Sequence, residues 1–189
     1  MPRQLQLEYG EIIHAAGFSS FDCVLGFGGA GRVTEDKRLS VCRVWKVSLA
    51  VLLSDSQIRS KVSSSLDEHS VYKKLFDKHG NLVTKWSPTF PEKRLPYAVF
   101  ITPLHIYRPH KDLEIAMVLK LADEFGADAR IVVYEPTRDC SQADLKSIGF
   151  RKLNDLAVFA LSVRKAQVAA LMAERFPKTR ITTKIQTKA

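Results

Sequence analysis

Apolar residues recur at strand and helix spacing along the whole chain, most regularly from residue 97 onward. Strands are expected over 97–106, 131–134 and 156–163, helices over about 112–126, 141–149 and 165–176, and a last edge strand over 180–185. Pro103 should break the first of these strands or place it at a sheet edge, because proline cannot donate a backbone hydrogen bond. Asp112 and Ser141 are the expected caps of the first two helices. This alternation predicts an α/β fold in which helices pack on a mixed or mostly parallel sheet.

The first half is patterned differently. Residues 21–25 form an expected strand, and 41–53 alternate with period two, as in a half-buried strand. Asp55 can then cap a helix over roughly 56–78, and 82–86 is a further candidate strand. The two halves meet at a proline-rich connector over 86–96, which contains Pro88, Pro91 and Pro96. We expect a single domain over 1–189, with this connector as the place of any subdivision.

The segment from Gly26 to Gly31 satisfies the dinucleotide-binding pattern G-x-G-x-x-G. That pattern works when its last glycine opens a helix whose amides hold a pyrophosphate. Here a polar, unpatterned stretch follows, and then a strand. The segment is therefore interpreted as a flexible loop between strands, and no cofactor is predicted. A narrower alternative is that its amides and Arg32 hold a single phosphate.

Charge distinguishes the C-terminus from the rest of the chain. The sequence has 29 Lys and Arg against 20 Asp and Glu, a net charge of +9. Residues 164–189 supply +6 of it, from one acid and seven bases: Arg164, Lys165, Arg175, Lys178, Arg180, Lys184 and Lys188. Such a local excess is typical of a surface that meets a polyanion. A solvated helix face followed by a frayed basic tail would have the same composition.

Bases also flank an aromatic residue on the alternating segment of the first half, where Trp45 lies between Arg43 and Lys46. Neighbours of this kind suit nucleic-acid contact. They equally suit a rim where the aliphatic stem of lysine covers an aromatic ring.

Motifs for metal-dependent or nucleophilic catalysis are missing from the sequence. The five histidines and three cysteines have no ligand spacing for zinc, and no serine sits in G-x-S-x-G. Cys140 precedes an expected helix start, which could lower the pKa of its thiol, but a structural or inert thiol is the favoured interpretation. Three scattered cysteines, no signal peptide and no apolar membrane span indicate a soluble protein in a reducing intracellular compartment, cytoplasm or nucleus.

Residues 97–163, about a third of the chain, contain the sequence YRPHK, a helix ending in FGA, and LKSIGFR. This order of elements resembles the second half of the GNAT N-acetyltransferases. The resemblance implies acyl-CoA binding near Arg108, His110 and Lys111. In that family, glycine amides at the start of the helix bind the pyrophosphate, and a tyrosine protonates the leaving thiolate. Here Pro109 and Asp112 occupy the loop, and Leu145 aligns with the tyrosine.

The sequence therefore favours a non-enzymatic binding or structural protein, whose basic C-terminal region engages nucleic acid or another polyanion. Arg43 and Lys46 are candidate additions to that surface. A degenerate GNAT-like acyltransferase is the first alternative. The second is a peripheral protein on an anionic membrane, drawn there by the same bases. Assembly into a homo-oligomer is compatible with each of them.

Overall fold

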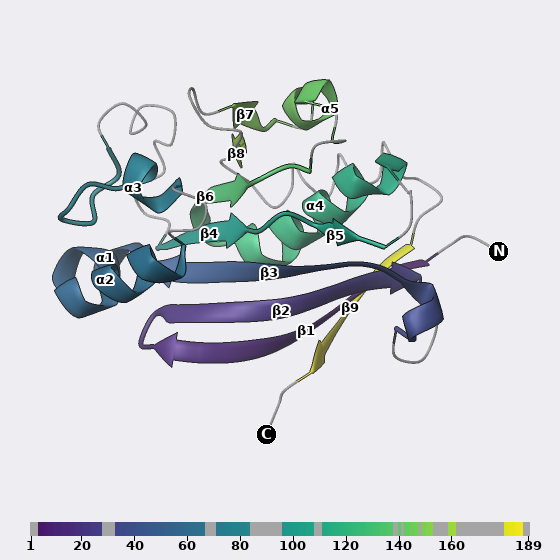
Figure 1. Cartoon of the computed structure of the whole chain (residues 1–189), viewed down its shortest axis with the longest axis horizontal. Helices are drawn as coiled ribbons and strands as arrows, with labels where there is room; N and C mark the ends of the chain where they lie inside the picture. Colours follow the sequence, from purple (N-terminus) through teal and green to yellow (C-terminus); the bar gives the residue numbers. More distant parts are fainter. Residues whose placement is uncertain are drawn as a thin grey trace.

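The fold is described from a computed structural model of the chain (Figure 1). The structure describes residues 4–27, 33–66, 71–83, 96–107, 111–137, 140, 142–147, 149–152, 159–161 and 180–186.

The first half begins with three long antiparallel strands. β1 (Gln4–Ala15) turns back through Gly17, whose φ of 73° is a left-handed conformation that glycine adopts without strain, into β2 (Phe18–Phe27). A short 3-10 helix, η1 (Glu35–Lys37), then leads into β3 (Arg38–Ser48). Three helices follow: α1 (Leu49–Ser54), α2 (Ser56–Ser65) and α3 (Val71–Leu75). Figure 1 shows α1 and α2 gathered at one end of β3.

The second half alternates strands and helices. β4 (Tyr97–Ile101) and the short β5 (His105–Ile106) precede α4 (Lys111–Gly126), the longest described helix. After it come β6 (Ala129–Tyr134), α5 (Gln142–Ser147), β7 (Arg151–Lys152), β8 (Phe159–Leu161) and β9 (Arg180–Gln186).

All nine described strands belong to one sheet. Eight of them follow the order β7-β8-β6-β4-β3-β2-β1-β9, and β5 pairs with β3. The β1–β9 and β4–β6 pairs are parallel, and the other described pairs are antiparallel. The predicted α/β fold with a mixed sheet and packed helices is therefore confirmed. Because β3 pairs with β4, strands from both sides of the proline-rich connector share this sheet.

Helices cover both faces of the sheet. On one face, α4 packs on a cluster that includes Leu7, Val44 and Val99. On the other face, Leu52 of α1, Val62 of α2 and Leu75 of α3 pack against alternate residues of the same strands. Successive side chains of a strand point to opposite faces, so each central strand contributes to both cores.

The strand expected over 41–53 ends earlier than predicted. β3 stops at Ser48, whose side chain accepts a hydrogen bond from Val51 N, and α1 begins at Leu49. Leu52 is then buried while Leu53 is 51% exposed, which reverses the burial that strand alternation implied. The apolar run continues past Ser48, but this serine caps a helix, so the strand ends there.

Several other boundaries differ from the sequence-based expectations. The 56–78 segment contains two helices, α2 and α3, and Asp55 does cap the first through Gln57 N and Ile58 N. α4 begins at Lys111, so Asp112 lies inside it and is not its cap. In the segment 82–86, the described part has only an isolated bridge between Leu82 and Phe76. Ser141 and the helix predicted over 165–176 lie outside the described residues.

Gly26 has a packing role. It belongs to β2, whereas residues 28–32 lie outside the described part. A Cβ atom at position 26 would lie 2.6 Å from the carbonyl oxygen of Lys37, closer than real Cβ contacts allow. The first glycine of the dinucleotide-like pattern is therefore required where β2 packs against the chain that enters β3.

β1 offers a matched test of the sheet. Leu7 is fully buried and Ile13, on the same strand, is 73% exposed. We expect Leu7→Ala to lower the free energy of unfolding by about 2–5 kcal/mol, since it leaves a cavity in the core. Ile13→Ala should cost less than about 1 kcal/mol. Urea unfolding measures both, and equal losses would contradict the burial pattern of β1.

Candidate functional site

The predicted C-terminal bases lie only partly within the described structure. Arg180 and Lys184 belong to β9, where their backbones pair with Gln4 and Glu8 of β1. The other five bases lie outside the described residues: Arg164, Lys165, Arg175, Lys178 and Lys188. Arg108 and His110 also lie outside, and Lys111 is the first residue of α4.

Arg43 and Lys46, the remaining candidates for polyanion binding, are not brought together. Arg43 Nε lies 2.7 Å from Asp22 Oδ1, and its guanidinium carbon is 5.7 Å from the centroid of the Trp45 ring. Lys46 Nζ donates to Asp128 at 2.7 Å and lies 4.5 Å from the centroid of the Tyr97 ring. Residues three apart on a strand face opposite ways. Each base is therefore paired with its own carboxylate on its own side of the sheet.

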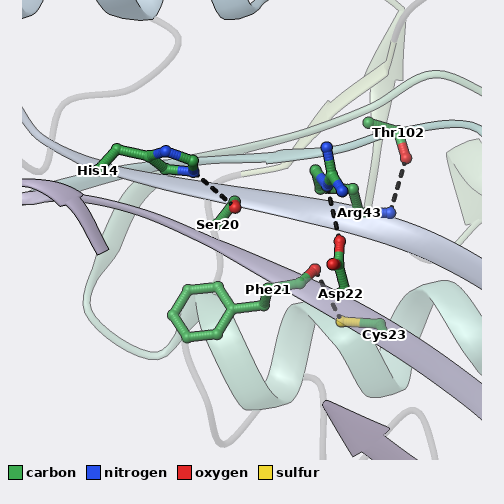
Figure 2. Close-up of polar contacts among 7 residues, drawn as sticks. All are labelled: His14, Ser20, Phe21, Asp22, Cys23, Arg43 and Thr102. Atoms are coloured by element: carbon green, nitrogen blue, oxygen red, sulfur yellow. Dashed lines mark hydrogen bonds and ion pairs between the residues drawn. The ribbon is translucent and has the colours of Figure 1, made fainter. Parts of the chain in front are cut away.

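An open groove of about 610 Å³ runs over β2 and β3, lined by Asp22, Arg43, Trp45, Ser64, Ser65 and Thr102 among others. Figure 2 shows its polar contacts: Arg43 reaches Asp22, and the backbone N–H of Arg43 donates to Thr102 Oγ1 at 2.9 Å. Because the one base and the one acid in this lining are paired, the groove has little net charge to attract a polyanion.

His14 and Ser20 form a hydrogen bond of 2.7 Å near this groove, and in Figure 2 the imidazole points toward the hydroxyl. The pair has the composition of a nucleophile and its base. Ser20 is fully buried, however, and the imidazole stacks near Phe18 and Trp45, with ring centroids 5.1 Å from each. A substrate could not reach the hydroxyl. The pair therefore fixes the β1–β2 hairpin against the core and is not a catalytic dyad.

The cysteines are arranged in a way that the sequence did not indicate. Cys23 and Cys42 are direct partners across β2 and β3, although 19 positions separate them in the sequence. Burial is the main reason that the pKa of the Cys23 thiol lies well above its ordinary value. The lowered pKa that a helix start could give Cys140 is not found. Burial, followed by the charge of Glu114, raises that pKa to about 12, so this thiol is a poor nucleophile.

A buried carboxylate, also missed from the sequence, connects α4 to the end of β6. Glu114 is 2% exposed and accepts hydrogen bonds from the Tyr134 hydroxyl and from Thr137, whose Oγ1 lies 2.7 Å away. Burial and then this carboxylate raise the pKa of Tyr134. The available sequence signal was an acid between two apolar residues, Leu113 and Ile115, near the start of the helix. Its hydrogen-bond donors satisfy the carboxylate, so it holds two elements together.

A second open cleft, of about 550 Å³, lies between α2 and α3. Its lining combines hydroxyl groups with three bases and one acid: Ser56, Arg59, Ser60, Ser63, Tyr72, Lys73, Phe76, Asp77 and Lys78. The three serines at positions 56, 60 and 63 follow helical spacing, which is the signal that the sequence offered for this surface. Unlike the groove over β2 and β3, this cleft has an excess of positive charge.

The described part of the chain has neither a cluster of metal ligands nor a helix that could span a membrane. Its His, Cys, Asp and Glu side chains do not gather in any group of three or more that could hold a metal ion. Within the same ranges, no helix has the length and apolar character needed to cross a bilayer. Comparisons with protein-family models, with curated proteins and with solved structures found no match to this chain.

His14 gives a pH-dependent prediction. Burial, assisted by the charges of Lys61 and Arg43 and opposed by Asp22, lowers its pKa from the ordinary 6.5. The unfolded chain then binds more protons than the folded chain as the pH falls through about 6.5. Stability should therefore decrease on acidification through that value, and the loss should be complete below the folded pKa.

Urea unfolding between pH 7.5 and 5 would measure this effect, with His14→Gln as the comparison. The variant should have a flatter pH dependence than the wild type, and the His14 ring in the wild type should titrate below 6.5 by NMR. A titration midpoint above 6.5 would show that the imidazolium is stabilised and would overturn the sign.

Proposed function

We propose that this protein is a non-enzymatic nucleic-acid-binding protein whose basic C-terminal region supplies the binding energy. The observation that carries the proposal is the position of the charge, since residues 164–189 hold +6 of the net +9. Lysine and arginine side chains that neutralise phosphates release counterions, and this gives affinity with little sequence preference.

Two features of the described structure support this assignment. Arg43 and Lys46 are each engaged by a carboxylate, so their charges are partly cancelled within the fold. The basic region also includes β9, whose backbone pairs with β1 at the edge of the sheet. Part of the region is thus held by the fold, which lowers the entropy cost of presenting its bases to a ligand.

Because β9 pairs with β1, truncating the C-terminus would disturb the sheet as well as remove charge. Substitution is the cleaner test. We expect Arg180→Gln/Lys184→Gln/Lys188→Gln to weaken binding to duplexes of unrelated sequence by a similar factor. If all three bases contact phosphates, the slope of log affinity against log salt should become shallower by about 2.7 for a duplex, or about 2 for a single strand. Fluorescence anisotropy over a salt series measures both quantities.

The matched control replaces three exposed bases elsewhere, as Lys37→Gln/Lys146→Gln/Lys152→Gln. This control should change the salt slope much less than the C-terminal variant does. The proposed location of binding would be falsified if the two variants weakened binding equally.

An anionic membrane would attract the same bases, and competition separates the two partners. If nucleic acid is the ligand, excess RNA or DNA should displace the protein from anionic liposomes in a flotation assay. Tight liposome binding that nucleic acid cannot displace would favour the membrane instead.

A second candidate, a degenerate GNAT-like acyltransferase, is supported by the order of elements after residue 97. β4 and β6 are parallel and joined through α4, and their register ends at Ile101 and Tyr134. Past Pro103 the chain continues along β3 as β5, so its described pairing with β6 ends at Ile101. Ligands often bind where two parallel strands of an α/β sheet end beside the start of a helix.

Acetyl-CoA should nevertheless bind weakly or not at all. Pro109 removes an amide donor and Asp112 adds negative charge at the implied pyrophosphate position, and the buried carboxylate of Glu114 lies on the same helix. Titration calorimetry with acetyl-CoA and CoA measures this. Micromolar affinity that is lost in Arg108→Ala or Lys111→Ala would place the acyltransferase above nucleic-acid binding.

A further inference from the structure

The cleft between α2 and α3 combines positive charge with hydrogen-bond donors, away from the C-terminal region. Arg59, Lys73 and Lys78 line it, against one acid, Asp77. The Asp77 carboxylate is already engaged by the amides of His79 at 2.8 Å and Asn81 at 2.9 Å. These hydrogen bonds, that of Asn81 first, lower the pKa of Asp77. The carboxylate is thus held by the turn after α3 and stays ionised, and the three bases outnumber it in the lining.

Arg59 is held in a fixed position. Its Nη1 donates to the carbonyl oxygens of Leu52 at 2.7 Å and Leu53 at 3.0 Å, at the end of α1. Its Nε and Nη2 donate to none of the described residues. Hydrogen bonds thus fix one side of the guanidinium. The N–H groups on its other side are suited to bind a tetrahedral oxyanion.

Tyr72 is an independent indication that a ligand belongs here. Its side chain lines the cleft and is 5% exposed, and its hydroxyl has no hydrogen-bond partner within the described residues. Burial raises its pKa and the charge of Arg59 opposes the rise, so the guanidinium acts on this hydroxyl. A buried donor without an acceptor is costly, and a ligand oxygen would satisfy it.

We propose that the α2–α3 cleft binds a phosphate group. Arg59, Lys73 and Lys78 neutralise its charge, and the hydroxyls of Tyr72 and of the α2 serines donate to its oxygens. The first amides of α2 are not part of this site, because Asp55 caps Gln57 N and Ile58 N. This inference is independent of the C-terminal bases, so either proposal can fail without the other.

The test titrates inorganic phosphate into the full-length protein and follows backbone amide shifts by NMR, with sodium chloride at matched ionic strength as the blank. We expect saturable shifts at Ser60, Ser63, Tyr72 and Lys73 that chloride does not produce. Absence of saturable shifts, or equal shifts with chloride, would overturn the proposal.

Variants then identify the ligating groups. Lys73→Gln/Lys78→Gln should raise the dissociation constant for phosphate by about tenfold. Lys74→Gln is the matched control, because Lys74 is an exposed base next to Lys73 that does not line the cleft, and it should change the constant less than about twofold. Equal effects of the two variants would indicate a general charge effect and contradict a defined site.

Tyr72→Phe separates binding from folding. It should weaken phosphate binding by about fivefold while leaving the melting temperature of the free protein unchanged or higher, because it removes a buried hydroxyl without a partner. A large fall in the melting temperature would show that the hydroxyl is already satisfied and would remove this part of the argument.

A further titration distinguishes a phosphate group of a nucleic-acid backbone from that of a small molecule. A short oligothymidylate that moves the same cleft amides identifies nucleic-acid backbone as the ligand. Shifts with inorganic phosphate alone identify a small phosphate ester. In either case the cleft should remain functional in Arg180→Gln/Lys184→Gln/Lys188→Gln, so failure of the cleft site and failure of C-terminal nucleic-acid binding give different results.

Discussion

The fold depends on β3 being buried on both faces. Val44 belongs to the core under α4, whereas Trp45 and Val47 belong to the core under α1, α2 and α3. β3 also pairs with β2 on one side and with β4 on the other, so it joins the antiparallel first half to the α/β second half. Both layers of helices therefore rest on alternate side chains of this one strand. A one-residue slip of its register would exchange the two cores.

The same alternation determines which charges are available for binding. Arg43 shares its face with Trp45 and meets Asp22, while Lys46 faces the other way and meets Asp128. Both pairs are part of the structure and contribute little net charge. In the sequence, the C-terminal region has the largest local excess of positive charge, and in the described structure the α2–α3 cleft is lined by three bases and one acid. Both proposals follow from that distribution.

Three groups with catalytic composition are better explained by packing. The His14–Ser20 pair is closed by the burial of Ser20, and the Cys140 thiol has its pKa raised to about 12. Glu114 is satisfied by the Tyr134 hydroxyl and Thr137 at the end of β6. The buried members of these groups, Ser20 and Glu114, hold elements of the fold together through their hydrogen bonds.

The sequence by itself indicated the α/β class, an effect of Pro103 on its strand, the apolar face of α4 and an edge strand over 180–185, because periodicity and proline chemistry act locally. It missed β1, although Leu5 and Leu7 alternate with Gln6 and Glu8 as in a strand; the two polar residues are buried as well. The sequence also predicted that the strand β3 continues through the residues of α1. The apolar alternation runs past Ser48, and it does not reveal that this serine caps a helix.

Only the tertiary structure decided which distant residues meet. The pairing of Cys23 with Cys42, the partners of Arg43 and Lys46, and the joining of α2 serines with α3 lysines in one cleft all depend on strand register and helix placement. Those are set by burying two cores at once, a constraint that no local pattern contains.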